Sequence, residues 1–165
     1  MSATSAARRI AKVTRWAQTQ TDLSGVVLVG SYARGSAKAS SDLDLILMVK
    51  DPALYLADPS WAGCFGRVKT QRVEDWGQVT SLRVGYTRGV EVEFGLATGR
   101  WIDLPLDPGT RKVLEGGYQL LFDRDGTIQR KLDTLGILPH DACRQRSALG
   151  RGTQRPTPAQ KRGKT

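Results

Sequence analysis

The chain has 165 residues, of which 39% are hydrophobic and 25% charged, a size and composition that suit one globular domain and not two. Its net charge is +9, and its longest run of large apolar residues, Leu45 to Val49, is far too short to cross a membrane. A single histidine, His140, and two distant cysteines, Cys64 and Cys143, exclude a soft-metal site and a disulfide framework, which leaves hard cations and a reducing cytoplasm as the expectation.

Residues 2–20 are rich in arginine and serine and poor in acids, a composition that would also suit a transit peptide. Ala6, Ile10, Val13 and Ala17, however, recur at the spacing of one helical face. We therefore predict an amphipathic first helix that packs on a sheet.

Short apolar runs bounded by turn residues follow this helix. The predicted strands and helical segments alternate along the chain: strands at 26–29, 42–49, 79–87, 90–96 and 118–122, and helical segments at 31–41 (a turn that leads into a loop), 53–57, 108–115 and 128–135. This order predicts an α/β (α+β) fold, with a small mixed β-sheet and helices packed on one face.

Two regions carry less pattern. Residues 58–78 show no clear element, and Trp61, Phe65 and Trp76 are expected to anchor them in the core. Residues 139–165 hold seven basic side chains and one acid, with almost no large apolar residue, so we predict a folded domain over 1–138 and a disordered basic tail over 139–165. The tail is interpreted as a solubilising extension, with an arm that binds nucleic acid or an acidic partner as the alternative.

The predicted second strand begins with Asp42 and Asp44, although aspartate is a poor strand former and a carboxylate beside a buried apolar run is costly. At about 3.3 Å per residue the two side chains point to one face, with Cα atoms roughly 7 Å apart. Carboxylates at this spacing could share one or two Mg²⁺ ions. The structural alternative is a simple cap between loop and strand.

Gly30 and Ser31 follow the first predicted strand and begin a helical turn. Glycine allows a close backbone approach, and the amides of a helix start and a serine hydroxyl donate to phosphate oxygens. Arg34 could reach the same anion, and Gly35 keeps the turn unobstructed. On its own, Gly-Ser after a strand is usually a plain turn.

A third acid is expected from a later strand. Glu91 and Glu93 share one face of the segment 90–94, and either could approach the metal. We favour Glu93, because Glu91 lies only two residues after the Arg88-Gly89 turn. The alternative is the solvated face of an ordinary strand.

The segments GSYARG and SDLDL, with Gly30-Ser31 ten residues before Asp42-x-Asp44, resemble the signature of the polymerase-β-like nucleotidyltransferase superfamily. They are especially similar to small aminoglycoside adenylyltransferases and to the minimal nucleotidyltransferases found as antitoxins. The resemblance implies a palm-like fold, with Gly30 and Ser31 on the triphosphate. It also implies that Asp42, Asp44 and Glu93 are the catalytic carboxylates that hold Mg²⁺. Ser41, at the start of SDLDL, joins Arg34 and Gly35 among the nucleotide-binding candidates.

The reaction implied by this resemblance moves AMP from ATP to a hydroxyl of a small molecule or protein and releases pyrophosphate. The chain shows no separate acceptor-binding helical domain, so a homodimer or partner protein is expected to complete the acceptor site. Two alternatives remain: an antitoxin-like enzyme that modifies a partner toxin, and an inactive protein that binds nucleotides or nucleic acid through the basic tail. Trp61, Trp76 and Trp101 could line the acceptor or base pocket, although core packing is the preferred interpretation.

Overall fold

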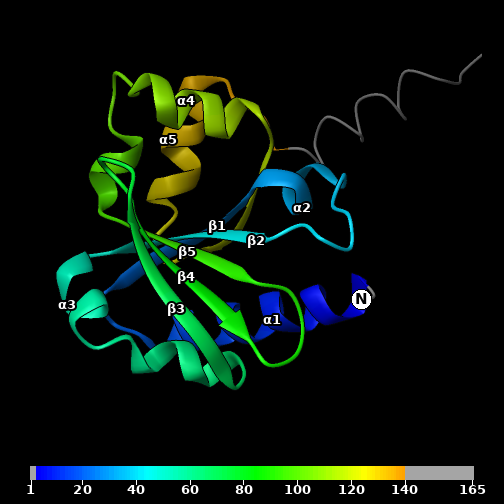
Figure 1. Cartoon of the computed structure of the whole chain (residues 1–165). Helices are drawn as coiled ribbons and strands as arrows, with labels where there is room; N and C mark the ends of the chain where they lie inside the picture. The colour runs from blue at the N-terminus through cyan, green and yellow to red at the C-terminus, as the bar shows by residue number, and fades with distance from the viewer. Residues whose placement is uncertain (1–2, 140–165) are drawn as a thin grey trace, which may run out of the picture.

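The computed structural model describes residues 3–139 as helices and short 3-10 segments between six strands (Figure 1). In chain order the elements are α1 (Ala3–Thr19), β1 (Leu23–Val29), α2 (Gly30–Arg34), β2 (Leu43–Val49), α3 (Pro52–Ala57), η1 (Pro59–Phe65), β3 (Val68–Asp75), β4 (Thr80–Tyr86), β5 (Val92–Ala97), η2 (Gly99–Ile102), α4 (Pro108–Glu115), β6 (Tyr118–Asp123) and α5 (Thr127–Leu135). The basic tail expected over 139–165 lies outside the described residues apart from Pro139.

The strands form one sheet in the order β3-β4-β5-β2-β1-β6. Neighbouring strands are antiparallel except β2 and β5, which run parallel. The expected mixed sheet of an α/β fold is therefore confirmed. The parallel pair at the centre matters for the site, because it sets β2 and β5 side by side with their amino ends at the same edge.

Strand β2 shows how both faces of this sheet are built. Leu43, Leu45 and Leu47 point to one face and are fully buried, while Ile46 and Met48 are buried on the other face. Successive strand residues alternate between faces, so an unbroken apolar run requires cover on both. Asp44 lies on the face of Ile46 and Met48, at the end of the strand where the apolar cover stops.

Helices cover both faces of the sheet, which corrects the expectation of helices on one face. Figure 1 shows α1 and α3 on one side of the sheet and α4 and α5 on the other. The α1 side buries Ala6, Val13 and Ala17 of the predicted amphipathic helix, and the α5 side buries Ile128 and Leu132. The second layer forms because β1 and β2 are apolar on both faces, so each face needs cover.

Aromatic side chains fill the α1 side. Trp16 stacks on Trp61 with ring centroids 5.5 Å apart, and Trp61 meets Phe94 edge-on at 5.0 Å. The expected anchoring roles of Trp61 and Phe65 are confirmed, since Phe65 is 2% exposed and Trp61 packs against the same core. The same expectation is wrong for Trp76, which is 64% exposed at the end of the hairpin that joins β3 and β4.

Strand β3 was not predicted, because it is an edge strand whose side chains are almost all exposed or half-exposed. A strand of this kind has no apolar alternation to reveal it. Its partner β4 forms the expected hairpin with β5. Within residues 3–139, no helix combines the length and apolar character needed to cross a membrane.

Arg9 of α1 fastens the β4–β5 hairpin to the rest of the fold. Its guanidinium donates hydrogen bonds to the carbonyl oxygens of Val90 and Arg88, both at 2.8 Å, and lies 4.2 Å from the ring centroid of Tyr86. Arg9 is 8% exposed, and burial lowers the pKa of its guanidinium. The hydrogen bonds and the cation–π contact offset that desolvation. The first helix thus holds the turn from which β5 enters the site.

Candidate active site

Asp44 and Glu93 are paired directly across the parallel strands β2 and β5. Residues opposite each other in a sheet point to the same face, so both carboxylates lie together at the amino ends of their strands. Asp42 comes two residues earlier, just before β2, which begins at Leu43 and not at Asp42 as expected. The structure thus brings Asp42, Asp44 and Glu93 to one edge of the sheet.

Gly30 lies against this pair. Its φ of +73° is in the left-handed region, and a Cβ on residue 30 would overlap Oδ2 of Asp44. Val29, the residue before it, is the cross-strand partner of Asp44. Glycine at position 30 is therefore required by the backbone conformation and by the close approach of the Asp44 carboxylate.

The other predicted nucleotide-binding residues lie around α2. Ser31 is in its first turn, and the Arg34 side chain lies against Gly117, where a Cβ would be 2.9 Å from Cγ of Arg34. Gly35 ends α2 with a φ of +70°, which explains glycine there by helix termination. The hydroxyl of Ser41 accepts a hydrogen bond from the backbone N–H of Lys38 at 2.8 Å.

Arg83 of β4 was not predicted, and it holds four carboxylates. Its Nη1 donates to Asp42 at 2.7 Å and to Glu91 at 3.1 Å, and its Nη2 donates to Glu93 at 2.9 Å and to Glu74 at 3.4 Å. Arg83 is the cross-strand partner of Glu93. The predicted turn at Arg88-Gly89 pairs Val84, and not Arg83, with Glu93, so the predicted register did not reveal this contact; the structure shifts the pairing by one residue.

The carboxyl group of Asp44 has a strongly raised pKa. Burial raises its pKa to about 7, and the nearby negative charges of Glu93 and Asp42 add to this effect, as does a hydrogen bond with Glu93. The positive charge of Arg83 acts in the opposite direction. A carboxyl pKa this high indicates crowded negative charge in a partly dry site, which is typical of functional sites.

A cavity of about 540 Å³ begins at these residues. One wall contains Gly30, Arg34, Asp44 and Glu93 from the predicted site. Another part of its lining comes from segments far away in the sequence, namely the β3–β4 turn, η2 and α4: Trp76, Gln78, Trp101, Thr110, Lys112 and Val113.

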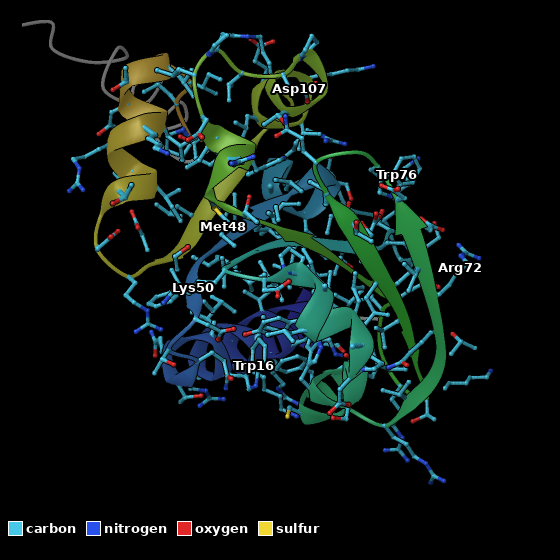
Figure 2. All side chains as sticks on the ribbon, turned by 90° about the vertical axis from the view of Figure 1, so that its left-hand side faces the viewer. Trp16, Met48, Lys50, Arg72, Trp76 and Asp107 are labelled. Atoms are coloured by element: carbon cyan, nitrogen blue, oxygen red, sulfur yellow. The ribbon has the colours of Figure 1, made fainter. Side chains whose placement is uncertain are left out.

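Figure 2 labels Trp76 on the hairpin and Asp107 at the start of α4, both of which line this cavity, and Trp16 on the opposite face. The volume is in the range of small-molecule sites. Trp101 is both a cavity residue and a core residue, since it is 3% exposed.

The donor chemistry of this edge suits a hard cation such as Mg²⁺. Asp42, Asp44 and Glu93 supply carboxylate oxygens, and a divalent cation would relieve the repulsion that raises the pKa of Asp44. Within residues 3–139, no three His, Cys, Asp or Glu side chains already surround a common metal position. Two of the three candidate ligands, Asp42 and Glu93, are instead hydrogen-bonded to Arg83.

Comparison with known proteins agrees with the resemblance in the motifs. The family model described as streptomycin adenylyltransferase matches residues 4–135, most of the chain. Among solved structures, an aminoglycoside 6-adenyltransferase from Bacillus subtilis is similar with a TM-score of 0.43 and 13% identity. That alignment covers 56% of this chain and 36% of the Bacillus chain, so the present chain spans well under half of that enzyme. No curated protein matches. Because the family model covers most of the chain, this protein belongs to the streptomycin adenylyltransferase family of nucleotidyltransferases.

Proposed function

We propose that this protein transfers AMP from ATP to a hydroxyl group of a small molecule, with Mg²⁺ as cofactor and pyrophosphate as the second product. The observation that carries the proposal is that Gly30, Asp44 and Glu93 line the same cavity. They come from three neighbouring elements, α2, β2 and β5. Family membership supports the reaction class. A cavity of about 540 Å³ favours a small acceptor over a protein surface.

The sheet order suggests which end of the cavity takes which substrate. From β1 towards β4 the site presents Gly30, then Asp44 on β2, then Glu93 on β5. Attack on a phosphorus atom is in line, so the acceptor hydroxyl and the leaving pyrophosphate lie on opposite sides of it. With the triphosphate at Gly30 and Ser31, the acceptor would lie beyond Glu93, towards β4 and Trp76.

The chemistry follows from this placement. The acceptor oxygen forms a bond to the α-phosphorus, the bond from that phosphorus to the bridging oxygen breaks, and pyrophosphate leaves with the electron pair. Glu93 would take the hydroxyl proton, Asp42 and Asp44 would hold Mg²⁺, and Arg34 would contact the phosphates from α2. Mg²⁺, when bound, would neutralise charge on the phosphate oxygens and position the α-phosphate.

The expected homodimer or partner protein stays part of the proposal. Trp76 and Val113 are 64% and 41% exposed, and both line the cavity, so its rim offers apolar surface to a second chain. A cytoplasmic location would supply ATP and Mg²⁺. Sedimentation of the active protein tests the oligomer, and a fully active monomer would contradict it.

The decisive experiment measures pyrophosphate release from ATP and Mg²⁺ with a panel of hydroxyl acceptors, starting with streptomycin because of the family description. Wild type is compared with Asp44→Asn and with the control Asp103→Asn, which changes an exposed aspartate paired with Lys131. We expect acceptor-dependent release that is lost only in Asp44→Asn. Release that survives in Asp44→Asn would sink the proposal.

A further inference from the structure

Arg83 stands where the proposed function places a cation. Its guanidinium projects from β4 towards carboxylates on β5 and just before β2, and it donates to Asp42 and Glu93 at 2.7 and 2.9 Å. Two further carboxylates, Glu91 and Glu74, accept from the same group. Among the described residues, Asp44 is the one predicted metal ligand to which Arg83 donates no hydrogen bond, although its charge acts on Asp44.

The charge on Arg83 is permanent. Its side chain is 18% exposed, and an arginine guanidinium in a protein is not deprotonated. A planar guanidinium with five N–H donors can serve several carboxylates at once, which a lysine ammonium at the same place cannot do in fixed geometry. The carboxylates Asp42, Glu74, Glu91 and Glu93 are therefore arranged around an internal cation, the guanidinium of Arg83.

Strand register holds this cation in place. Arg83 is paired with Glu93 across β4 and β5, and Glu93 is paired with Asp44 across β5 and β2. The three side chains thus form a row across the sheet on one face. Arg9 fixes the hairpin that carries Arg83 and Glu93 by its bonds to Val90 and Arg88.

We infer that Arg83 takes the place of one divalent ion in this site, so that the group formed by Asp42, Asp44 and Glu93 holds a single Mg²⁺, beside Asp44, and not two. This inference rests on the proposed function. The guanidinium neutralises Asp42 and Glu93 and positions them, which leaves one cation place, beside Asp44. Arg83 is thus a positioning residue that sets the metal count of the site.

Titration of the full chain with Mn²⁺, in place of Mg²⁺, tests the inference without any turnover. Electron paramagnetic resonance of free Mn²⁺ counts the bound ions in wild type, Arg83→Gln, Arg83→Lys and the control Arg111→Gln. Arg111 is an exposed arginine with one carboxylate partner, Glu115 at 3.2 Å. Its replacement therefore removes an arginine–carboxylate pair at the surface, away from the site. Thermal melting with and without Mn²⁺ is measured on each variant.

Wild type, Arg111→Gln and Arg83→Lys are expected to bind one Mn²⁺, because each keeps a positive charge at position 83. Arg83→Gln is expected to bind a second Mn²⁺ ion, since the carboxylates lose their internal cation. Arg83→Gln should also melt at a lower temperature and recover more than wild type when Mn²⁺ is added. A purely structural role would lower the melting temperature without changing the count or affinity of Mn²⁺.

Two Mn²⁺ ions in wild type, or the same number of bound Mn²⁺ ions in wild type and Arg83→Gln, would overturn the inference. Two ions in Arg83→Lys would also overturn it, since charge would not then set the count. If wild type transfers AMP while any of these results is obtained, the proposed function stands and only the role of Arg83 fails. If neither wild type nor Arg83→Gln binds Mn²⁺, the inference is overturned. If wild type also fails to transfer AMP, the proposed function is overturned as well.

Discussion

Gly30 and Asp44 meet so closely that a side chain on residue 30 would occupy the place of the Asp44 carboxylate. The two residues belong to the two halves of the motif, Gly-Ser and Asp-x-Asp, which are separated by the loop after α2. The antiparallel pairing of β1 with β2, in which Val29 lies opposite Asp44, brings them together. One contact therefore couples the proposed phosphate end of the site to its carboxylate end.

Gly30→Ala should destabilise the fold and abolish nucleotide transfer. The left-handed backbone costs a non-glycine residue roughly 1–2 kcal/mol, and the added methyl must also displace Asp44. Gly136→Ala is the matched control, because its φ of +68° is similar and open space surrounds the added atom. We expect a lower melting temperature in both variants and loss of AMP transfer in Gly30→Ala alone. Equal activity in the two variants would show that the contact with Asp44 is not needed.

Asp44→Asn should change the pH dependence of stability. The pKa of Asp44 is about 7 in the folded chain against an ordinary 3.8, so the folded state binds this proton more tightly than the unfolded state. The resulting stabilisation is fully present below the ordinary pKa and is lost as pH rises through the folded value. Relative to wild type, Asp44→Asn should therefore be more stable at about pH 8 than at about pH 5.

Urea unfolding at both pH values, without divalent metal, measures this difference in the free energy of unfolding. Asp103→Asn, on the exposed pair with Lys131, serves as the control and should show no comparable trend. A difference between wild type and Asp44→Asn that stays constant over the pH range would contradict the assignment of the raised pKa.

Glu93→Gln and Glu91→Gln separate the two glutamates that the sequence left as rivals. Both accept a hydrogen bond from Arg83, at 2.9 and 3.1 Å, so each variant loses one such ion pair. Glu93 alone is opposite Asp44 in the sheet and lines the cavity. We expect kcat to fall about 10²–10⁴-fold in Glu93→Gln, as for loss of a general base, and far less in Glu91→Gln. The reverse order would reassign the third carboxylate to Glu91.

Trp76→Ala should weaken binding of the acceptor and leave the fold intact. Trp76 is 64% exposed and lines the cavity from the turn between β3 and β4. Loss of its ring should raise KM for the acceptor roughly three- to tenfold, with KM for ATP unchanged. Val73→Ala, at an exposed valine of β3, is the control. A rise in KM for ATP in Trp76→Ala would instead place the nucleotide base at this end.

Local patterns predicted most helices and strands, because each had its own apolar period and its own end signals. The amphipathic α1, the two buried strands β1 and β2 and the β4–β5 hairpin follow their apolar patterns. The second layer of helices was missed, since a sequence shows that β2 is apolar on both faces but not which helix covers which face. Edge strand β3 and the exposed Trp76 were also missed, because exposed segments leave no apolar period and a tryptophan looks alike in a core and at a cavity.

The sequence by itself determined the local arrangement of the candidate site residues. Side chains in a strand alternate, so Asp44 had to lie on the face opposite Leu43 and Leu45, and Gly30-Ser31 had to follow the first apolar strand. Only the tertiary structure decided that Glu93 is the acid opposite Asp44, that Arg83 joins four carboxylates and that α4 closes the cavity. The physical reason is range: alternation is a property of adjacent residues, whereas pairing and register between distant strands depend on packing of the whole sheet.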